Sequence, residues 1–351
     1  MSQTYGQLVQ SGLRSFRRGD FHAALGCFGK AAARARREGA TYGELRALAW
    51  IQVALFDSGQ YRATVKASRR LLKRASESGQ EEFQMRGRLL MAAGLEKIDL
   101  RHHYPTVKRM LLRGLDYARS TCNNHYICYH LTRLGGYAVR VGELQEGAER
   151  LYEARDMLDA CFEIRYLRYC TYVYLSRLMQ RRGEHDEAVR DAEIGLRDAQ
   201  AAENPVLVAD ARLTLARALQ GRGDLRKAFS LADEVLSRSL KLRWLFDEQE
   251  AQRLRAELLC EMGRPEEAEV AARRALELAS ATGMREHRVL CLISLGRILM
   301  RSGRDEAAAV LSQARRLARR RQYDDHARTA EGLLQALPKA PAAAGPSATY
   351  G

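Results

Sequence analysis

Proline is scarce in this chain, with six residues among 351. Three of them, Pro105, Pro205 and Pro265, fall near the starts of expected helices, where a first-turn N–H has no partner to lose. The other three lie beyond residue 337. The sequence also has no run of alternating β-branched residues, which would indicate a strand. These absences favour a chain that is helical over most of its length.

The seven cysteines form no Cys-x-x-Cys pair, and no stretch of about 18 apolar residues could span a membrane. Four cysteines stand inside expected helices, where Cys commonly acts as a small apolar residue: Cys27, Cys170, Cys260 and Cys291. This usage is typical of a reducing compartment. The N-terminus has no apolar signal core either. We therefore expect a cytoplasmic protein with no membrane-spanning segment.

The sequence lacks the short motifs of common enzyme classes. It has no Walker phosphate-binding loop, no Gly-x-Gly-x-x-Gly after a strand, no Gly-x-Ser-x-Gly and no His-Glu-x-x-His. Residues 122–130 hold two Cys and two His but match no zinc framework, because structural zinc needs four ligands that converge tetrahedrally. Cys128 and His130, two apart on one helix, point in different directions. We predict no catalytic residues, no metal site and no cofactor, although an active site built from distant helices stays open.

Positive charge is in excess. The chain has 58 Lys and Arg side chains against 43 Asp and Glu, which gives a net charge of +15. The excess comes almost entirely from Arg, so a codon bias of the genome explains it as well as a functional basic surface does. A basic surface would favour an acidic partner.

A motif recurs at intervals of about 40 residues. In its clearest copy Gly263 ends one helix, Pro265 starts the next, and apolar, mostly small residues then share one face: Ala268, Ala271, Ala272, Ala275, Leu276 and Ala279. Turns of this kind stand near residues 19, 59, 101, 142, 183, 223, 263 and 303, the third without its glycine. Small residues also precede and follow most of the turns at fixed distances. Each unit is therefore predicted to be two helices that cross closely at small residues.

This pattern resembles the tetratricopeptide repeat family, from near Tyr5 to about Arg321. The resemblance implies an all-α fold, a right-handed α-solenoid of about eight helix-turn-helix repeats that each contact only their neighbours. The period exceeds the family's usual length of about 34 residues, as in kinesin light chains and bacterial pheromone or sugar sensors. We expect one superhelical domain over residues 1–337, with a capping helix at residues 324–337. The Pro-, Ala- and Gly-rich residues 338–351 are expected to be a disordered tail.

In the tetratricopeptide family the first helix of each repeat lines a concave groove, and the resemblance carries that surface to fixed positions before each turn. The residues expected to bind a partner there are Phe56, Arg88, Tyr129, Arg140, Arg177, Arg181, Arg217, Arg253 and Arg297. Tyrosines crowd the fourth and fifth repeats. Tyr129 and Tyr169 are expected at the exposed surface. Gap filling between helices is the expectation for Tyr126, Tyr166 and Tyr172.

The leading hypothesis is a non-catalytic interaction module, or scaffold, that holds a peptide or a partner protein in this groove. Its partner should carry acidic and apolar side chains, because the planar Arg fork binds a carboxylate with two hydrogen bonds. One alternative is a signal-sensing regulator that acts through a partner. The other is a nucleic-acid-binding basic solenoid, against which the few lysines and the absence of RNA-recognition motifs argue. Self-association stays open.

Overall fold

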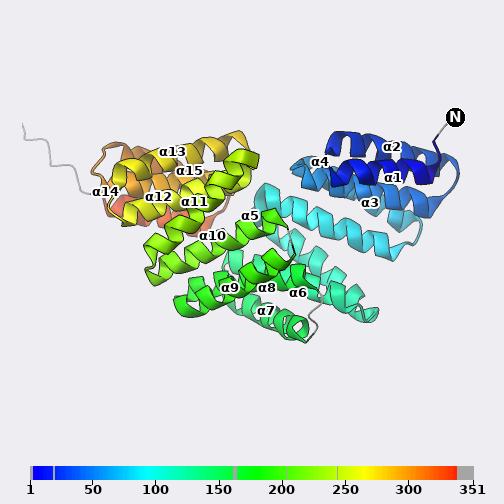
Figure 1. Ribbon diagram of the computed structural model, residues 1–351, viewed down its shortest axis with the longest axis horizontal. Helices are drawn as coiled ribbons and strands as arrows, with labels where there is room; N and C mark the ends of the chain where they lie inside the picture. Colours follow the sequence, from blue (N-terminus) through cyan, green and yellow to red (C-terminus); the bar gives the residue numbers. More distant parts are fainter. Residues whose placement is uncertain (1–2, 19, 161–163, 203, 243, 338–351) are drawn as a thin grey trace, which may run out of the picture. The chain divides into compact units, whose positions relative to one another are not determined.

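The computed structural model describes residues 3–18, 20–160, 164–202, 204–242 and 244–337. These described residues form sixteen helices and no strand, which confirms the all-α prediction (Figure 1). The helices are α1 (Tyr5–Arg17), α2 (Phe21–Arg37), α3 (Thr41–Asp57), α4 (Tyr61–Glu77), α5 (Glu81–Ser120), α6 (Asn124–Val141), α7 (Leu144–Asp159), α8 (Arg165–Arg182), α9 (His185–Ala201), α10 (Pro205–Arg222), α11 (Leu225–Leu242), α12 (Leu245–Glu261), α13 (Pro265–Ala281), α14 (Arg285–Arg301), α15 (Glu306–Arg320) and α16 (Asp324–Gln335). The expected turn residue Gly19 and the expected tail lie outside the described part of the chain.

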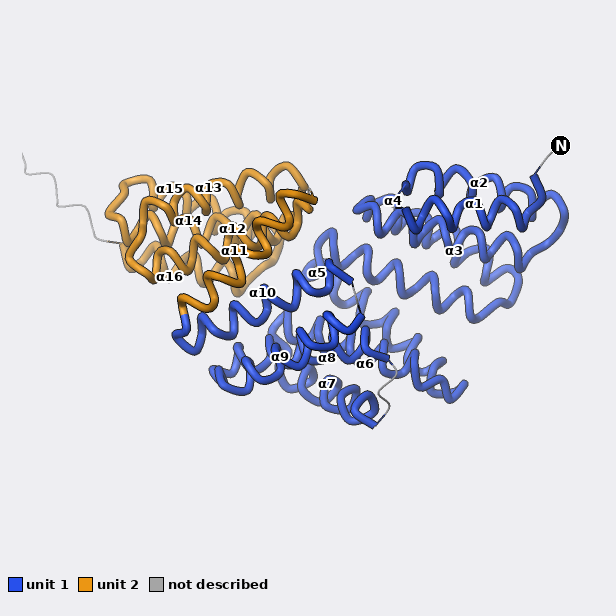
Figure 2. Tube along the Cα trace, in the orientation of Figure 1, with its two compact units in different colours: residues 1–224 blue, residues 225–351 orange. Residues whose placement is uncertain are grey.

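The chain divides into two compact units, unit 1 (Met1–Asp224) and unit 2 (Leu225–Gly351) (Figure 2). Within each unit, consecutive helices pack as pairs: α1 with α2, α3 with α4, α6 with α7 and α8 with α9 in unit 1, and α12 with α13 and α14 with α15 in unit 2. We call the helices before the turns first helices, namely α1, α3, the first half of α5, α6, α8, α10, α12 and α14. The helices after the turns are second helices. Helices packed in sequence as pairs are the repeat architecture that the sequence predicts.

Glycine ends several first helices because the chain there needs a left-handed residue. Gly142 has a φ of 101°, and its N–H donates to the carbonyl oxygens of Ala138 and Val139. Gly183 and Gly223 take the same conformation, with φ of 79° and 93°. A residue with a Cβ rarely adopts such a φ, whereas glycine does so readily. The chain can thus reverse between α6 and α7 within two residues.

The third repeat has no such turn. The expected turn near Arg101 falls inside α5, which runs from Glu81 to Ser120 with one kink. At the kink, Asp99 is extended, with φ of −171° and ψ of 85°, and its Oδ1 accepts a hydrogen bond from the His102 N–H at 3.3 Å. One extended residue whose carboxylate caps the following helix thus takes the place of the glycine turn. Pro105 accordingly lies inside α5 rather than at a helix start.

Small residues let paired helices cross closely, as the sequence predicts. Gly135 of α6 faces Gly147 of α7, and a Cβ built on Gly135 would lie 3.0 Å from the Gly147 carbonyl oxygen. It would also lie 2.7 Å from Leu151 Cγ. Contacts this short are not made by real Cβ atoms without a shift of the backbone. The two glycines therefore set the separation between α6 and α7.

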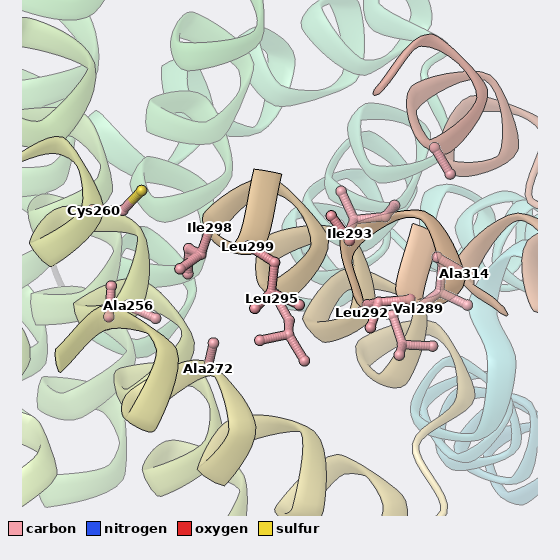
Figure 3. Packing of buried hydrophobic residues seen from close by; sticks show 14 of the residues in the cluster. Ala256, Cys260, Ala272, Val289, Leu292, Ile293, Leu295, Ile298, Leu299 and Ala314 are labelled. Carbon is pink, nitrogen blue, oxygen red and sulfur yellow. The ribbon is translucent and has the colours of Figure 1, made fainter. Parts of the chain in front are cut away.

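The alanine face of α13 lies in the core of unit 2. Ala272 of α13 and Ala256 of α12 are buried with Leu295 and Leu299 of α14, as Figure 3 shows. Helix α16 closes this stack, because it packs on α14 and α15 and buries Ala330. Its place at the end of the stack confirms the predicted capping helix.

Candidate partner-binding surface

The first helices form the closely packed side of each unit. In unit 1, α6 contacts α8, and α8 contacts α10. No contact joins the second helices α7 and α9 in the part of the chain that the structure describes. In unit 2, α12 also contacts α14 along the backbone, whereas the link between α13 and α15 is the ion pair of Arg273 and Glu306, at 2.6 Å. A partner that spans several repeats would therefore find their side chains closest together along the first helices.

Bonds between neighbouring first helices define a continuous surface, which we call the first-helix face of unit 1. Its members recur at three- and four-residue steps and share one side of each helix. They are Tyr129, Arg133, Gly136 and Arg140 on α6, Tyr166, Cys170, Tyr174, Arg177 and Arg181 on α8, and Asp210, Thr214 and Arg217 on α10.

Arg133 lies among tyrosines at the centre of this face. Its Nη2 donates to the Tyr166 hydroxyl at 3.1 Å, and its Nη1 donates to the Tyr174 hydroxyl at 3.3 Å. Its guanidinium carbon is 5.4 Å from the centroid of the Tyr129 ring. Burial raises the pKa of Tyr174, so this phenol stays neutral at ordinary pH. Among the described residues, no carboxylate forms an ion pair with Arg133, although, against the effect of burial, the charge of Arg133 helps to lower the pKa of Glu96.

Gly136 makes room for the tyrosine that holds Arg133. A Cβ built on Gly136 would lie 2.4 Å from Cδ2 of Tyr174, so the ring rests directly on the α6 backbone. Nearby, the buried hydroxyls of Thr132 and Thr171 lie 2.7 Å apart and join α6 to α8 by a hydrogen bond. The position of Tyr174 is thus fixed by the backbone of the preceding repeat.

Asp210 binds the next arginine of the face. Arg177 Nη2 donates to Asp210 Oδ1 at 2.8 Å, and the Tyr169 hydroxyl donates to Asp210 Oδ2 at 2.7 Å. Arg140 forms a salt bridge with Glu96 of α5, which is buried. These bonds link α5 to α6 and α8 to α10. Arg140 and Arg177 therefore stabilise the stack of repeats, and a ligand would have to compete with their own carboxylates.

The other expected site residues of unit 1 differ in their exposure and in their bonds. Arg181 is exposed on α8 and makes no hydrogen bond or ion pair with the described residues, and Arg217 is half-buried on α10. Arg88 donates to Gln84 Oε1 at 3.0 Å, and burial, followed by the charge of Arg113, lowers its pKa. Phe56 packs edge-on against Tyr61, with the ring centroids 5.5 Å apart.

Two expected site residues belong to unit 2. Arg253 is buried between two carboxylates of its own helix, with Nη2 3.0 Å from Glu250 Oε2 and Nη1 2.8 Å from Glu257 Oε1. The second carboxylate also accepts a hydrogen bond from Ser294 Oγ at 2.6 Å. Arg297 is exposed on α14. The charge of Arg253 is thus balanced within its helix, unlike that of Arg133.

Two expectations about the tyrosines were wrong. Tyr169 is buried, with 4% of its surface exposed, because its hydroxyl reaches Asp210 on the next first helix. Tyr166, expected to fill a gap, is 40% exposed. The sequence interpretation also missed Arg133. Stepping four residues along the helix from Tyr129 finds it, since residues four apart share a face.

Metal and membrane features are not found in the described residues. No group of three or more His, Cys, Asp or Glu side chains there could hold a metal ion. None of the helices within those ranges is long and apolar enough to cross a bilayer.

Residues 208–242, in α10 and α11, match the family model described as Tetratricopeptide repeat. Comparison with curated proteins gave no match. Among solved structures, the chain is similar to a Rap protein complexed with Competence and Sporulation Factor, at 10% identity and a TM-score of 0.63, over 95% of this chain and 97% of that one. It is similar to the apo form of RapI at 15% identity and a TM-score of 0.62, over 79% of this chain and 97% of that one.

A third similar structure is the apo form of the quorum sensor NprR from B. thuringiensis. The identity is 11% and the TM-score 0.52, over 82% of this chain and 84% of that one. At such identities the likeness shows a shared fold. With the match of residues 208–242 to a tetratricopeptide repeat and the helix pairs at the predicted period, the chain has the fold of a tetratricopeptide repeat solenoid.

Proposed function

We propose that the chain is a non-catalytic interaction module that binds a peptide or a partner protein on the first-helix face of unit 1. Arg133 supports this proposal most directly, because phenol hydroxyls hold its charged guanidinium and no carboxylate of the described residues pairs with it. A guanidinium has five N–H donors, and the two tyrosines take two of them. An acidic side chain or a C-terminal carboxylate of a ligand would form the direct ion pair that Arg133 does not make with the described residues.

The surroundings of Arg133 suit a ligand with both acidic and apolar groups. The face carries five arginines, Arg133, Arg140, Arg177, Arg181 and Arg217; Glu96 pairs with Arg140, and Asp210 pairs with Arg177. Tyrosine rings beside Arg133 offer apolar area with a polar tip, a composition enriched at binding surfaces. We infer an extended or helical segment that places a carboxylate at Arg133 and an apolar side chain against the neighbouring tyrosines.

A signal-sensing regulator that acts through a partner is the second candidate. It is favoured by the likeness to a Rap protein complexed with Competence and Sporulation Factor and to the quorum sensor NprR. In this form of the proposal the segment bound on the first-helix face is a signal peptide. The output then passes to a second protein.

Replacing Arg133 by Gln tests the proposal. The variant keeps a hydrogen-bond donor for the tyrosines but removes the charge, so the binding of acidic peptides should weaken about tenfold, or by about 1.4 kcal/mol. The probe is a library of short peptides with Asp or Glu at one position and Leu or Phe beside it, titrated by fluorescence anisotropy against the full chain. A matched library with Lys in place of the acid should not bind.

The control is Arg190→Gln, which removes an exposed arginine from the second helix α9. It should leave the affinity unchanged. Changing Arg177 would be a poor test, because a loss of its ion pair with Asp210 disturbs the stack as well as the surface. Equal affinity of wild type and Arg133→Gln for every bound peptide would contradict the proposal, as would a library without any acidic binder.

A further inference from the structure

The outer face of α4 carries a row of cations. Five exposed side chains recur at the three- and four-residue steps of one helix face: Arg62, Lys66, Arg69, Arg70 and Lys73. We call them the α4 basic stripe. None of the five forms a hydrogen bond or ion pair within the described ranges. From first to last they span about 16 Å along the helix, at about 1.5 Å per residue.

Three carboxylates near this stripe are bound by arginines that lie outside it. Arg74, which lies outside the stripe, binds Glu44 of α3 at 2.8 Å and Glu77 of α4 at 3.0 Å. At the start of α5, Glu82 pairs with Arg86 at 2.7 Å. The positive charge of the α4 basic stripe therefore stays uncompensated by these acids.

A general preference for Arg does not explain the stripe, because equivalent helices differ in charge. Helix α4 has six Lys and Arg side chains and one Glu, a net charge of +5. The second helices α7 and α9 of the same unit each have five acidic and two basic side chains, a net charge of −3. Residues 1–80 as a whole carry +9 of the chain's +15, with fourteen Lys and Arg against five Asp and Glu. Such a local concentration of charge points to a polyanionic partner.

The second helices on either side of α4 also carry exposed basic side chains. Exposed Lys30 lies on α2, and exposed Arg109 and Arg113 lie on the second half of α5. In the described chain none of the three forms an ion pair. Lys30 and Arg70 both lie eleven residues after their turns, and Arg113 lies twelve residues after the expected third turn near residue 101. Three successive repeats thus present cations on their second helices.

The described second helices around the stripe expose no large apolar side chain that would support other kinds of partner. Within the described residues, no large exposed hydrophobic side chain lies on α2, α4 or the second half of α5. Stable protein interfaces need buried aromatic or aliphatic anchors. Membrane-surface helices insert apolar side chains, and single-stranded nucleic acid stacks its bases on aromatic rings. Duplex backbones need only cations, because phosphate contacts position a protein without reading bases.

We propose that the α4 basic stripe binds the phosphate backbone of duplex DNA without sequence preference. B-form DNA carries one negative charge per about 1.7 Å of axis, counting both strands, so a duplex as long as the stripe carries about ten phosphates, about five on each strand. This surface lies on second helices and does not depend on the peptide-binding proposal for the first-helix face.

The test is a titration of the full chain with a labelled DNA duplex at several salt concentrations. With about five phosphates neutralised, the logarithm of the binding constant should fall with the logarithm of salt with a slope of about −4. The double variant Lys66→Glu/Arg70→Glu should bind at least about tenfold more weakly at low salt, with a slope less steep by about two. The control Arg190→Glu/Arg197→Glu makes the same change in net charge on exposed positions of α9 and should bind like the wild type.

Parallel titrations with single-stranded DNA, duplex RNA, polyglutamate and vesicles containing phosphatidylserine identify the class of ligand. Helical content and thermal unfolding of both variants should match the wild type. The proposal is overturned if the two double variants lose affinity equally. It is also overturned if the wild type does not bind duplex DNA and binds polyglutamate, vesicles or RNA instead. In that case the stripe variant would lose affinity for this other ligand.

Discussion

Replacing Gly114 by alanine is expected to lower the free energy of unfolding by about 3 kcal/mol. Gly114 lies in the second half of α5, directly against the ring of His130 on α6. A Cβ there would lie 2.1 Å from Cε1 of this ring, and the histidine is completely buried. Because the ring has no room to move aside, α5 and α6 would have to separate. Urea denaturation followed by circular dichroism measures the loss.

The chain offers a matched control for this change. Gly26 is an exposed glycine inside α2 with no atom within 4 Å of a Cβ built on it, so Gly26→Ala should stabilise the helix by about 1 kcal/mol. Adding His130→Ala to Gly114→Ala should recover part of the lost stability, because the clash disappears with the ring. A Gly114→Ala variant as stable as the wild type would show that the two helices do not meet as described.

Acidification from pH 7 to pH 5 is expected to remove about 2 kcal/mol of stability through His130. Burial lowers the pKa of this histidine to about 4, and neither of its ring nitrogens has a hydrogen-bond partner among the described residues. In the unfolded chain the pKa returns to about 6.5. The unfolded state therefore takes up a proton between these two values and the folded state does not, so stability falls as the pH drops through this window.

The difference between the wild type and His130→Leu isolates this contribution. Burial raises the pKa of Asp191 to about 6. A carboxyl group whose pKa is raised by folding stabilises the folded protein as the pH falls, so Asp191 opposes the effect of His130. Asp191 titrates in both proteins, so its effect cancels in the comparison. Between pH 7 and pH 5, the free energy of unfolding should fall by about 2 kcal/mol more in the wild type than in the His130→Leu variant. An equal pH dependence would mean that His130 is solvated in the folded protein.

The repeat could be predicted from sequence because its signals are local. A left-handed glycine such as Gly142, and small residues such as Gly135 and Gly147, follow from the geometry of one helix pair and recur at each copy. The third repeat departs from the pattern, because Asp99 ends a helical segment by an extended conformation that any residue can adopt. No residue type marks such a kink in advance.

The candidate surface was less predictable, because its bonds join residues one repeat apart. Arg177 was expected at the binding surface, but its partner Asp210 lies 33 residues later in the sequence. No local spacing of residues predicts this ion pair. The same is true of Tyr169, whose burial depends on that carboxylate. Arg133 matches no expected position, and its place in the site follows from the tyrosines of α8 that accept its hydrogen bonds.

The bonds between first helices have a mechanical consequence. Arg133 connects α6 to α8 through Tyr166 and Tyr174, and Asp210 connects α8 to α10 through Tyr169 and Arg177. A ligand carboxylate that draws the guanidinium away from both phenols would leave the Thr132–Thr171 hydrogen bond to join α6 to α8, while the bonds to Asp210 hold. The angle between those two repeats would then change, and each later helix of unit 1 would swing with it. In such a stack a shift of the Arg133 side chain would become a displacement that grows with distance along the later helices of unit 1.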